Sequence, residues 1–149
     1  MSRIMKLLVA SIMVTSFAVP VTVNAAGQLK VSCSVVVDYV FNGNAAESYQ
    51  KVFVIEPGLS FDDDFSTFTR QKTFFASTVL DAGNTVVGIS YFNDVGVFDA
   101  IDFSTKLMLH KKGVAESTSG SHTFSTTAGG TPQREYTINY TLTCKQAKQ

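Results

Sequence analysis

The stretch Leu29–Asn42, LKVSCSVVVDYVFN, decides the fold class. Each odd position holds an apolar residue or a cysteine, and most even positions hold a polar residue. This side-chain period of two is typical of a β-strand with one buried side and one solvent-facing side. The segment Glu135–Lys145, EYTINYTLTCK, has the same alternation near the end of the sequence. We therefore predict a first and a last strand that direct Cys33 and Cys144 into one core.

Between these segments, further strands are indicated by alternating or β-branched runs that turn residues separate. We predict such strands at Gln50–Ile55, Lys72–Leu80, Thr85–Phe92, Phe103–Lys112 and Ser121–Thr127. The polar segment Gly113–Ser121 is predicted to be a loop. A total of about seven or eight strands at this spacing is typical of a sandwich or a barrel. The sequence thus predicts one all-β domain, residues 26–149, built as an antiparallel sandwich or small barrel.

The segment Ser60–Arg70, SFDDDFSTFTR, departs from the alternation. Its phenylalanines, Phe61, Phe65 and Phe68, are spaced i, i+4 and i+7, which is the spacing of one helix face. A serine stands in the N-cap position, and the three aspartates fall in the first turn, where the helix dipole favours negative charge. We predict one short helix near Phe61–Arg70.

The predicted hairpin between Lys72 and Phe92 has two unusual features. The run Lys72–Leu80 is apolar on both faces, so we expect it to be buried more deeply than the other strands. Gly88 interrupts the second run of the hairpin. A glycine in the middle of a strand predicts a bulge or the close approach of another element.

The first 25 residues have the features of a secretory signal peptide. Arg3 and Lys6 form a basic start, Leu7–Val19 is an apolar run, and Val23 and Ala25 are small residues at the −3 and −1 positions of a cleavage site. We predict cleavage after Ala25, a periplasmic or secreted location, and no membrane span after cleavage. The remaining 124 of the 149 residues suffice for one hydrophobic core.

Two cysteines remain after the predicted cleavage, Cys33 and Cys144. In an oxidising compartment this favours one disulfide between them, which would join the two ends of the domain. Two buried free thiols are the alternative.

No metal site or cofactor is predicted. The two cysteines, His110 and His122 lack the spacing of zinc ligands. The run Asp62–Asp64 lacks the alternating acids and the glycine of an EF-hand loop. Calcium binding by these aspartates is an alternative that the sequence leaves open.

Charge argues against some classes of partner. The chain has 12 basic and 12 acidic residues, and the predicted cleavage changes the net charge to near −2. Lys111 and Lys112 form the one adjacent basic pair. Nucleic acids and anionic membrane surfaces both require clustered cations, so we predict neither as a partner.

The sequence contains no specific catalytic motif. There is no G-x-S-x-G element, and Ser121 and His122 are neighbours in sequence, so in a strand their side chains would point to opposite faces. A small secreted hydrolase stays an alternative, but we favour a non-enzymatic binding or structural module whose partner is a protein or a surface glycan.

Two segments are candidate binding surfaces, and the first of them mixes apolar and acidic residues without strand periodicity. The first lies around Asn93–Asp102, where we single out Phe92, Asp94, Val97, Phe98 and Asp99. The second is the polar patch Ser117–His122, where we single out Ser119 and His122.

The predicted loop carries the pair Ser119-Gly120. Together with a signal peptide, a small all-β body and a disulfide between terminal segments, this pair resembles periplasmic β-sheet inhibitors of lytic enzymes. The tyrosine that those inhibitors place next is replaced by His122-Thr123. The resemblance implies, as an alternative function, inhibition of a lysozyme or a protease, and it assigns no site residue. Exported sandwich domains of pilus and adhesin subunits are a second analogy.

Overall fold

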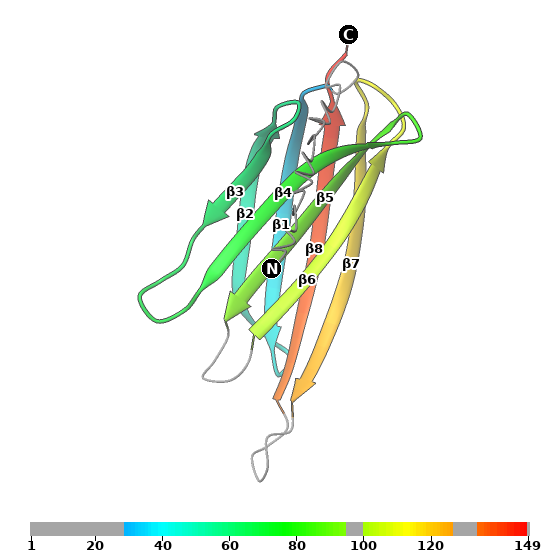
Figure 1. Ribbon diagram of the computed structural model, residues 1–149. Helices are drawn as coiled ribbons and strands as arrows, with labels where there is room; N and C mark the ends of the chain where they lie inside the picture. Colours follow the sequence, from blue (N-terminus) through cyan, green and yellow to red (C-terminus); the bar gives the residue numbers. More distant parts are fainter. Residues whose placement is uncertain (1–28, 95–99, 127–133, 149) are drawn as a thin grey trace, which may run out of the picture.

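The computed structural model describes residues 29–94, 100–126 and 134–148. These residues form eight strands, and Figure 1 shows them as two sheets that lie face to face. The strands are β1 (Val31–Phe41), β2 (Asn44–Ile55), β3 (Ser60–Asp64), β4 (Lys72–Asp81), β5 (Asn84–Asp94), β6 (Ala100–Leu109), β7 (Ala115–Thr126) and β8 (Arg134–Gln146).

One sheet has the strand order β2-β1-β8-β7 and the other β3-β4-β5-β6; we call them sheet A and sheet B. All neighbouring strands are antiparallel. The chain passes from sheet A to sheet B after β2 and returns after β6. The prediction of an all-β antiparallel fold with about seven or eight strands is confirmed, and the arrangement is a sandwich.

The alternating segments Leu29–Asn42 and Glu135–Lys145 correspond to β1 and β8, the two central strands of sheet A. Each of these strands packs one face on the opposite sheet, while its other face meets solvent, as is common in antiparallel sheets. Their inward side chains and the aromatic residues of the other strands form one core. The most deeply buried large side chains include Val31, Val35, Ile55, Phe74, Tyr91, Ile101, Ile138 and Leu142.

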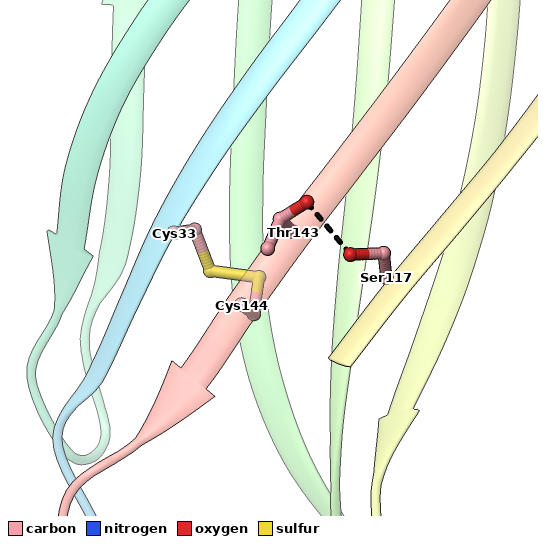
Figure 2. Close-up of a disulfide and its surroundings, with 4 residues drawn as sticks. All are labelled: Cys33, Ser117, Thr143 and Cys144. Atoms are coloured by element: carbon pink, nitrogen blue, oxygen red, sulfur yellow. Dashed lines mark hydrogen bonds between the residues drawn. A yellow bond between two sulfur atoms is a disulfide. The ribbon is translucent and has the colours of Figure 1, made fainter. Parts of the chain in front are cut away.

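The disulfide prediction is confirmed. Cys33 on β1 lies opposite Cys144 on β8, and their sulfur atoms are bonded (Figure 2). Both residues are buried in the core between the sheets. The bridge joins positions 111 residues apart in the chain. A buried disulfide is consistent with an oxidising compartment.

The short helix predicted near Phe61–Arg70 is wrong. Residues Ser60–Asp64 form β3, which pairs with β4, and the described residues contain no helix. A separation of four residues keeps two side chains on one face of a strand as well as of a helix. Phe61 and Phe65 use this geometry to stack on Phe53 and Tyr49, with ring centroids 4.7 and 4.4 Å apart. The third phenylalanine, Phe68, is fully exposed.

The loop predicted at Gly113–Ser121 is also wrong, because β7 begins at Ala115. This strand lies at the edge of sheet A, and its outward residues, which include Ser117, Ser119, Ser121 and Thr123, are exposed. Serine and threonine are sufficient there because little apolar surface has to be buried. Because the segment has low hydrophobicity, its sequence does not indicate the edge strand that it forms.

Candidate functional site

A shallow depression of about 520 Å³ lies on the outer face of sheet B. Two cross-strand rows over β4, β5 and β6 form it. One row consists of Phe75, Ser90 and Ser104, and the next of Ser77, Gly88 and Lys106. Its volume lies within the range of small-ligand sites, which is about 300–1,000 Å³.

Gly88 forms the floor of this depression. β4, β5 and β6 pair around it without a shift of register, so the predicted bulge is absent. No other element approaches it closely: a Cβ atom built on Gly88 would meet the Ser77 hydroxyl at 4.0 Å and no nearer atom of the described residues. Both structural roles predicted for Gly88 are therefore wrong. The missing side chain instead leaves space that faces solvent.

The deep burial predicted for the run Lys72–Leu80 is also wrong for its outward residues. The Phe75 side chain is 39 % exposed, and Val79 and Leu80 are exposed as well. The reason is that sheet B has no covering layer on its outer face among the described residues. Apolar residues on this face border the depression instead of filling a core.

The depression combines three kinds of chemical group. Phe75 offers an aromatic ring, three serines offer hydroxyls that donate and accept hydrogen bonds, and Lys106 offers an ammonium group. Lys106 forms no ion pair with a described residue. Such a surface can pack against an apolar face of a ligand while it binds polar groups at the ligand's rim.

The first predicted binding segment is partly described. Phe92 is half-buried on the outer face of sheet B, between Thr73 and Asp102, in the row next to Phe75. Asp94 ends β5, and its carbonyl oxygen accepts a 2.7 Å hydrogen bond from Arg70 Nε. Val97, Phe98 and Asp99 lie outside the described residues. Phe92 is thus the predicted residue that lies beside the depression.

The second predicted patch, Ser119 and His122, lies on β7 of sheet A and not beside the depression. Ser119 is exposed on the outer face of the sheet. His122 stands on the opposite face of the strand, where its ring stacks on Tyr140 at 5.8 Å and packs near Phe103 at 5.5 Å. The alternation of side chains along β7 therefore separates the two residues.

Gly120 explains why a glycine stands between them. It pairs with Tyr140 on β8, and the Tyr140 ring covers it: a Cβ atom on Gly120 would lie 2.7 Å from the tyrosine oxygen. Phe103 stacks on Tyr140 at 5.1 Å, and the Thr105 hydroxyl hydrogen-bonds the tyrosine oxygen at 3.1 Å. The Ser119-Gly120 pair thus lies within a strand and not in a loop, and inhibition of a lytic enzyme stays a prediction.

We expect Gly120→Ala to lower the free energy of unfolding by about 1–2 kcal/mol, because the Tyr140 ring is held on several sides and cannot move aside freely. Gly88→Ala is the matched control. Its Cβ atom has open space, so this variant should be neutral or slightly more stable. Urea unfolding of the two variants checks the prediction, and equal effects would contradict it.

A polar network that the sequence analysis missed closes one end of the core. Glu47 accepts from Lys72 Nζ and lies 3.3 Å from Arg70 Nη1. Arg70 Nη2 donates to Asn93 Oδ1 at 2.8 Å, and Asn93 Nδ2 donates to the Tyr91 oxygen at 3.0 Å. Burial raises the pKa of Tyr91, so this phenol stays neutral. Every member of the network has a partner, which is the condition for keeping such groups inside a protein.

Two further groups of titratable residues are paired locally. Burial, followed by a 2.8 Å hydrogen bond to Asp63, raises the pKa of Tyr49. The hydrogen bond from the His110 ring, at 2.9 Å, is the main cause that lowers the pKa of Glu116 below its usual value. His110 is exposed.

The aspartates considered for calcium point in different directions. Asp63 accepts from Tyr49 and pairs with Lys51 at 3.0 Å, whereas Asp64 accepts from the Ser66 amide at 3.0 Å. Interaction with the Ser66 side chain, followed by this amide hydrogen bond, lowers the pKa of Asp64. Within residues 29–94, 100–126 and 134–148, no group of three or more acidic, histidine or cysteine residues could hold a metal ion.

A scan against protein-family models, a search of curated proteins and a search of solved structures each found no match to this chain. In the part of the chain that the structure describes, no helix has the length and hydropathy of a membrane span.

Proposed function

We propose that the protein is a non-enzymatic binding module that acts outside the cytoplasm, in the periplasm or after secretion, and that it binds a glycan in the depression on sheet B. The observation that carries this proposal is the combination in one open site of the Phe75 ring, the hydroxyls of Ser77, Ser90 and Ser104, and the Lys106 ammonium group.

The chemistry of a sugar ring matches these groups. A pyranose presents C–H groups on one face, which pack on an aromatic ring, and hydroxyls around its rim, which need donors and acceptors. Phe75 is exposed enough to serve as the packing surface. The serine hydroxyls and Lys106 lie within the same two rows and supply the polar contacts. A flat and shallow site also suits one sugar unit of a longer glycan, since the neighbouring sugar units can extend over the rest of the sheet.

The fold supports a role outside the cytoplasm. The Cys33–Cys144 bond ties the first and last strands of the domain and is buried between the sheets. Such a bond persists where thiols are oxidised, as in the periplasm or the extracellular medium. The predicted signal peptide points to the same compartments.

The test is a screen of immobilised polysaccharides and oligosaccharides with the purified protein, followed by affinity measurements on the variant Gly88→Val. Valine suits a strand, and its Cβ atom has room at this position, so the variant should fold while its side chain fills the depression. We expect the dissociation constant for the bound glycan to rise at least about tenfold.

Thr141→Val is the matched control, because it introduces the same residue on the exposed outer face of sheet A. Its affinity should equal that of the unmodified protein. The proposal fails if no glycan binds, or if Gly88→Val binds as well as the control. Stoichiometric inhibition of a lysozyme or protease, or turnover of a substrate, would replace it by one of the alternative functions.

A further inference from the structure

The hydrogen bonds between β1 and β8 fix the direction of the backbone groups on β7. The backbone N–H of Asn42 donates to the backbone carbonyl of Glu135, and the backbone N–H of Ala147 donates to the backbone carbonyl of Lys30, each at 2.9 Å. Odd-numbered residues of β8 therefore bond to β1. In an antiparallel sheet the intervening, even-numbered residues direct their N–H and C=O groups to the other neighbour, which is β7.

Even-numbered residues of β8 lie opposite even-numbered residues of β7, as Gly120 opposite Tyr140 illustrates. The N–H and C=O groups of the even-numbered residues of β7 therefore form their hydrogen bonds with β8. The odd-numbered residues direct their N–H and C=O groups away from the sheet, and no described strand pairs with them. These residues are Ser117, Ser119, Ser121, Thr123 and Ser125.

This edge lacks the features that protect the other three. β3 has five residues and carries Asp62–Asp64, β2 carries Lys51 and a shift in its register with β1, and β6 carries Asp102 and Lys106. Charges, bulges and short length are the common means of preventing edge-to-edge pairing. The stretch Ser117–Ser125 has no acidic residue, lysine, arginine or proline, and its register with β8 is regular.

We propose that the free edge of β7 pairs antiparallel with β7 of a second copy of this chain, which forms a two-fold symmetric dimer. With Ser121 opposite its own copy, Ser119 lies opposite Thr123, and Ser117 lies opposite Ser125. All these residues direct their backbone groups to the edge, so each pair exchanges two hydrogen bonds. The pairing extends sheet A across the dimer, which is the geometry of strand addition.

A second copy fits this edge better than a different chain. Every outward side chain of the stretch carries a hydroxyl, so self-pairing sets hydroxyl opposite hydroxyl. Such pairs already join β7 to β8, where Ser117 lies 2.8 Å from Thr143 (Figure 2) and Thr123 lies 3.1 Å from Thr137. Because these outward side chains are uncharged, self-pairing places no like charges opposite each other. An uncharged edge also has no group that would select a charged partner.

The two-fold axis of such a pair runs perpendicular to sheet A. Both copies of sheet B then face the same side of the dimer, so two depressions are presented to one surface. If the proposed function holds, the dimer would bind a repeating glycan at two points and gain affinity from the linkage. The dimer itself does not depend on glycan binding and is tested without a ligand.

The test is sedimentation equilibrium of the purified protein and of two double variants. Ser119→Lys with Thr123→Lys places lysine opposite lysine in both symmetry-related pairs. Ser119→Glu with Thr123→Lys changes the same positions but places opposite charges across the interface. We expect the unmodified protein to dimerise, the first variant to raise the dimer dissociation constant at least about tenfold, and the second to dimerise more tightly than the first.

Several outcomes would overturn the proposal. If the protein is monomeric at every concentration, self-pairing is excluded, and the edge of β7 is available only to a different protein. A dimer that the lysine variant leaves intact would use another surface. Equal dissociation constants for the two variants would exclude the register with Ser121 on the axis. Circular dichroism and thermal unfolding of both variants separate these results from misfolding.

Discussion

Replacing Cys33 and Cys144 together by alanine is expected to lower the free energy of unfolding by about 4–5 kcal/mol. The bond closes a loop between positions 111 residues apart, so its loss greatly increases the freedom of the unfolded chain. For a domain of this size, the melting temperature should fall by an amount on the order of 15 °C.

Guanidinium unfolding of the variant, and of the unmodified protein under reducing conditions, checks this result. The dependence of stability on denaturant should also steepen, because an unfolded chain without the cross-link exposes more surface. The reduced protein controls for the loss of the sulfur atoms, since both cysteines remain in place. A decrease below about 1 kcal/mol in both cases would contradict the stabilising role of the bond.

The second large effect is expected for Glu47→Ala, which should lower the free energy of unfolding by about 2–3 kcal/mol. The Lys72 side chain is 9 % exposed, and the variant leaves its ammonium group beside Arg70 without the carboxylate that both contact. Removal of one partner of a fully buried pair costs about 3–5 kcal/mol, and the 26 % exposure of Glu47 reduces this value.

Glu56→Ala is the matched control for this experiment. Glu56 pairs with Lys30 at 2.7 Å, but the two side chains are 49 % and 53 % exposed. Water replaces such a contact easily, so we expect an effect below about 0.5 kcal/mol. Urea unfolding measures both variants, and equal effects would show that the network at the end of the core contributes no more than a surface ion pair.

The strands that the sequence predicted best are those at the centre of sheet A. β1 and β8 each bury one face, so the alternation of their side chains indicates both the strand and its inward residues. The same alternation placed Cys33 and Cys144 in one core, which made the disulfide predictable. β3 was missed, and only the second half of β7 was predicted, because these two edge strands carry few large apolar residues. In β3 the spacing of Phe61 and Phe65 fits a helix as well as a strand.

The depression on sheet B was not predictable from local pattern. Ser77, Gly88 and Lys106 belong to three strands, and the pairing register alone brings them into one row. The network around Glu47 and Lys72 depends in the same way on the packing of two sheets. A usable signal was nevertheless present: the small residues Ser77, Gly88, Ser90 and Ser104 alternate with apolar residues in the three strands, one of which also carries Phe75.

The most direct test of the proposed site is a nuclear magnetic resonance titration of the isotope-labelled protein with the glycan that binds it. We predict that the largest shifts of backbone amide signals cluster on the outer face of sheet B, at Ser77, Gly88, Ser90 and Ser104. Signals of β1 and β8 should stay in place. Shifts confined to β7, or to the segment 95–99, with those four amides unchanged would contradict the assignment of the site to the depression.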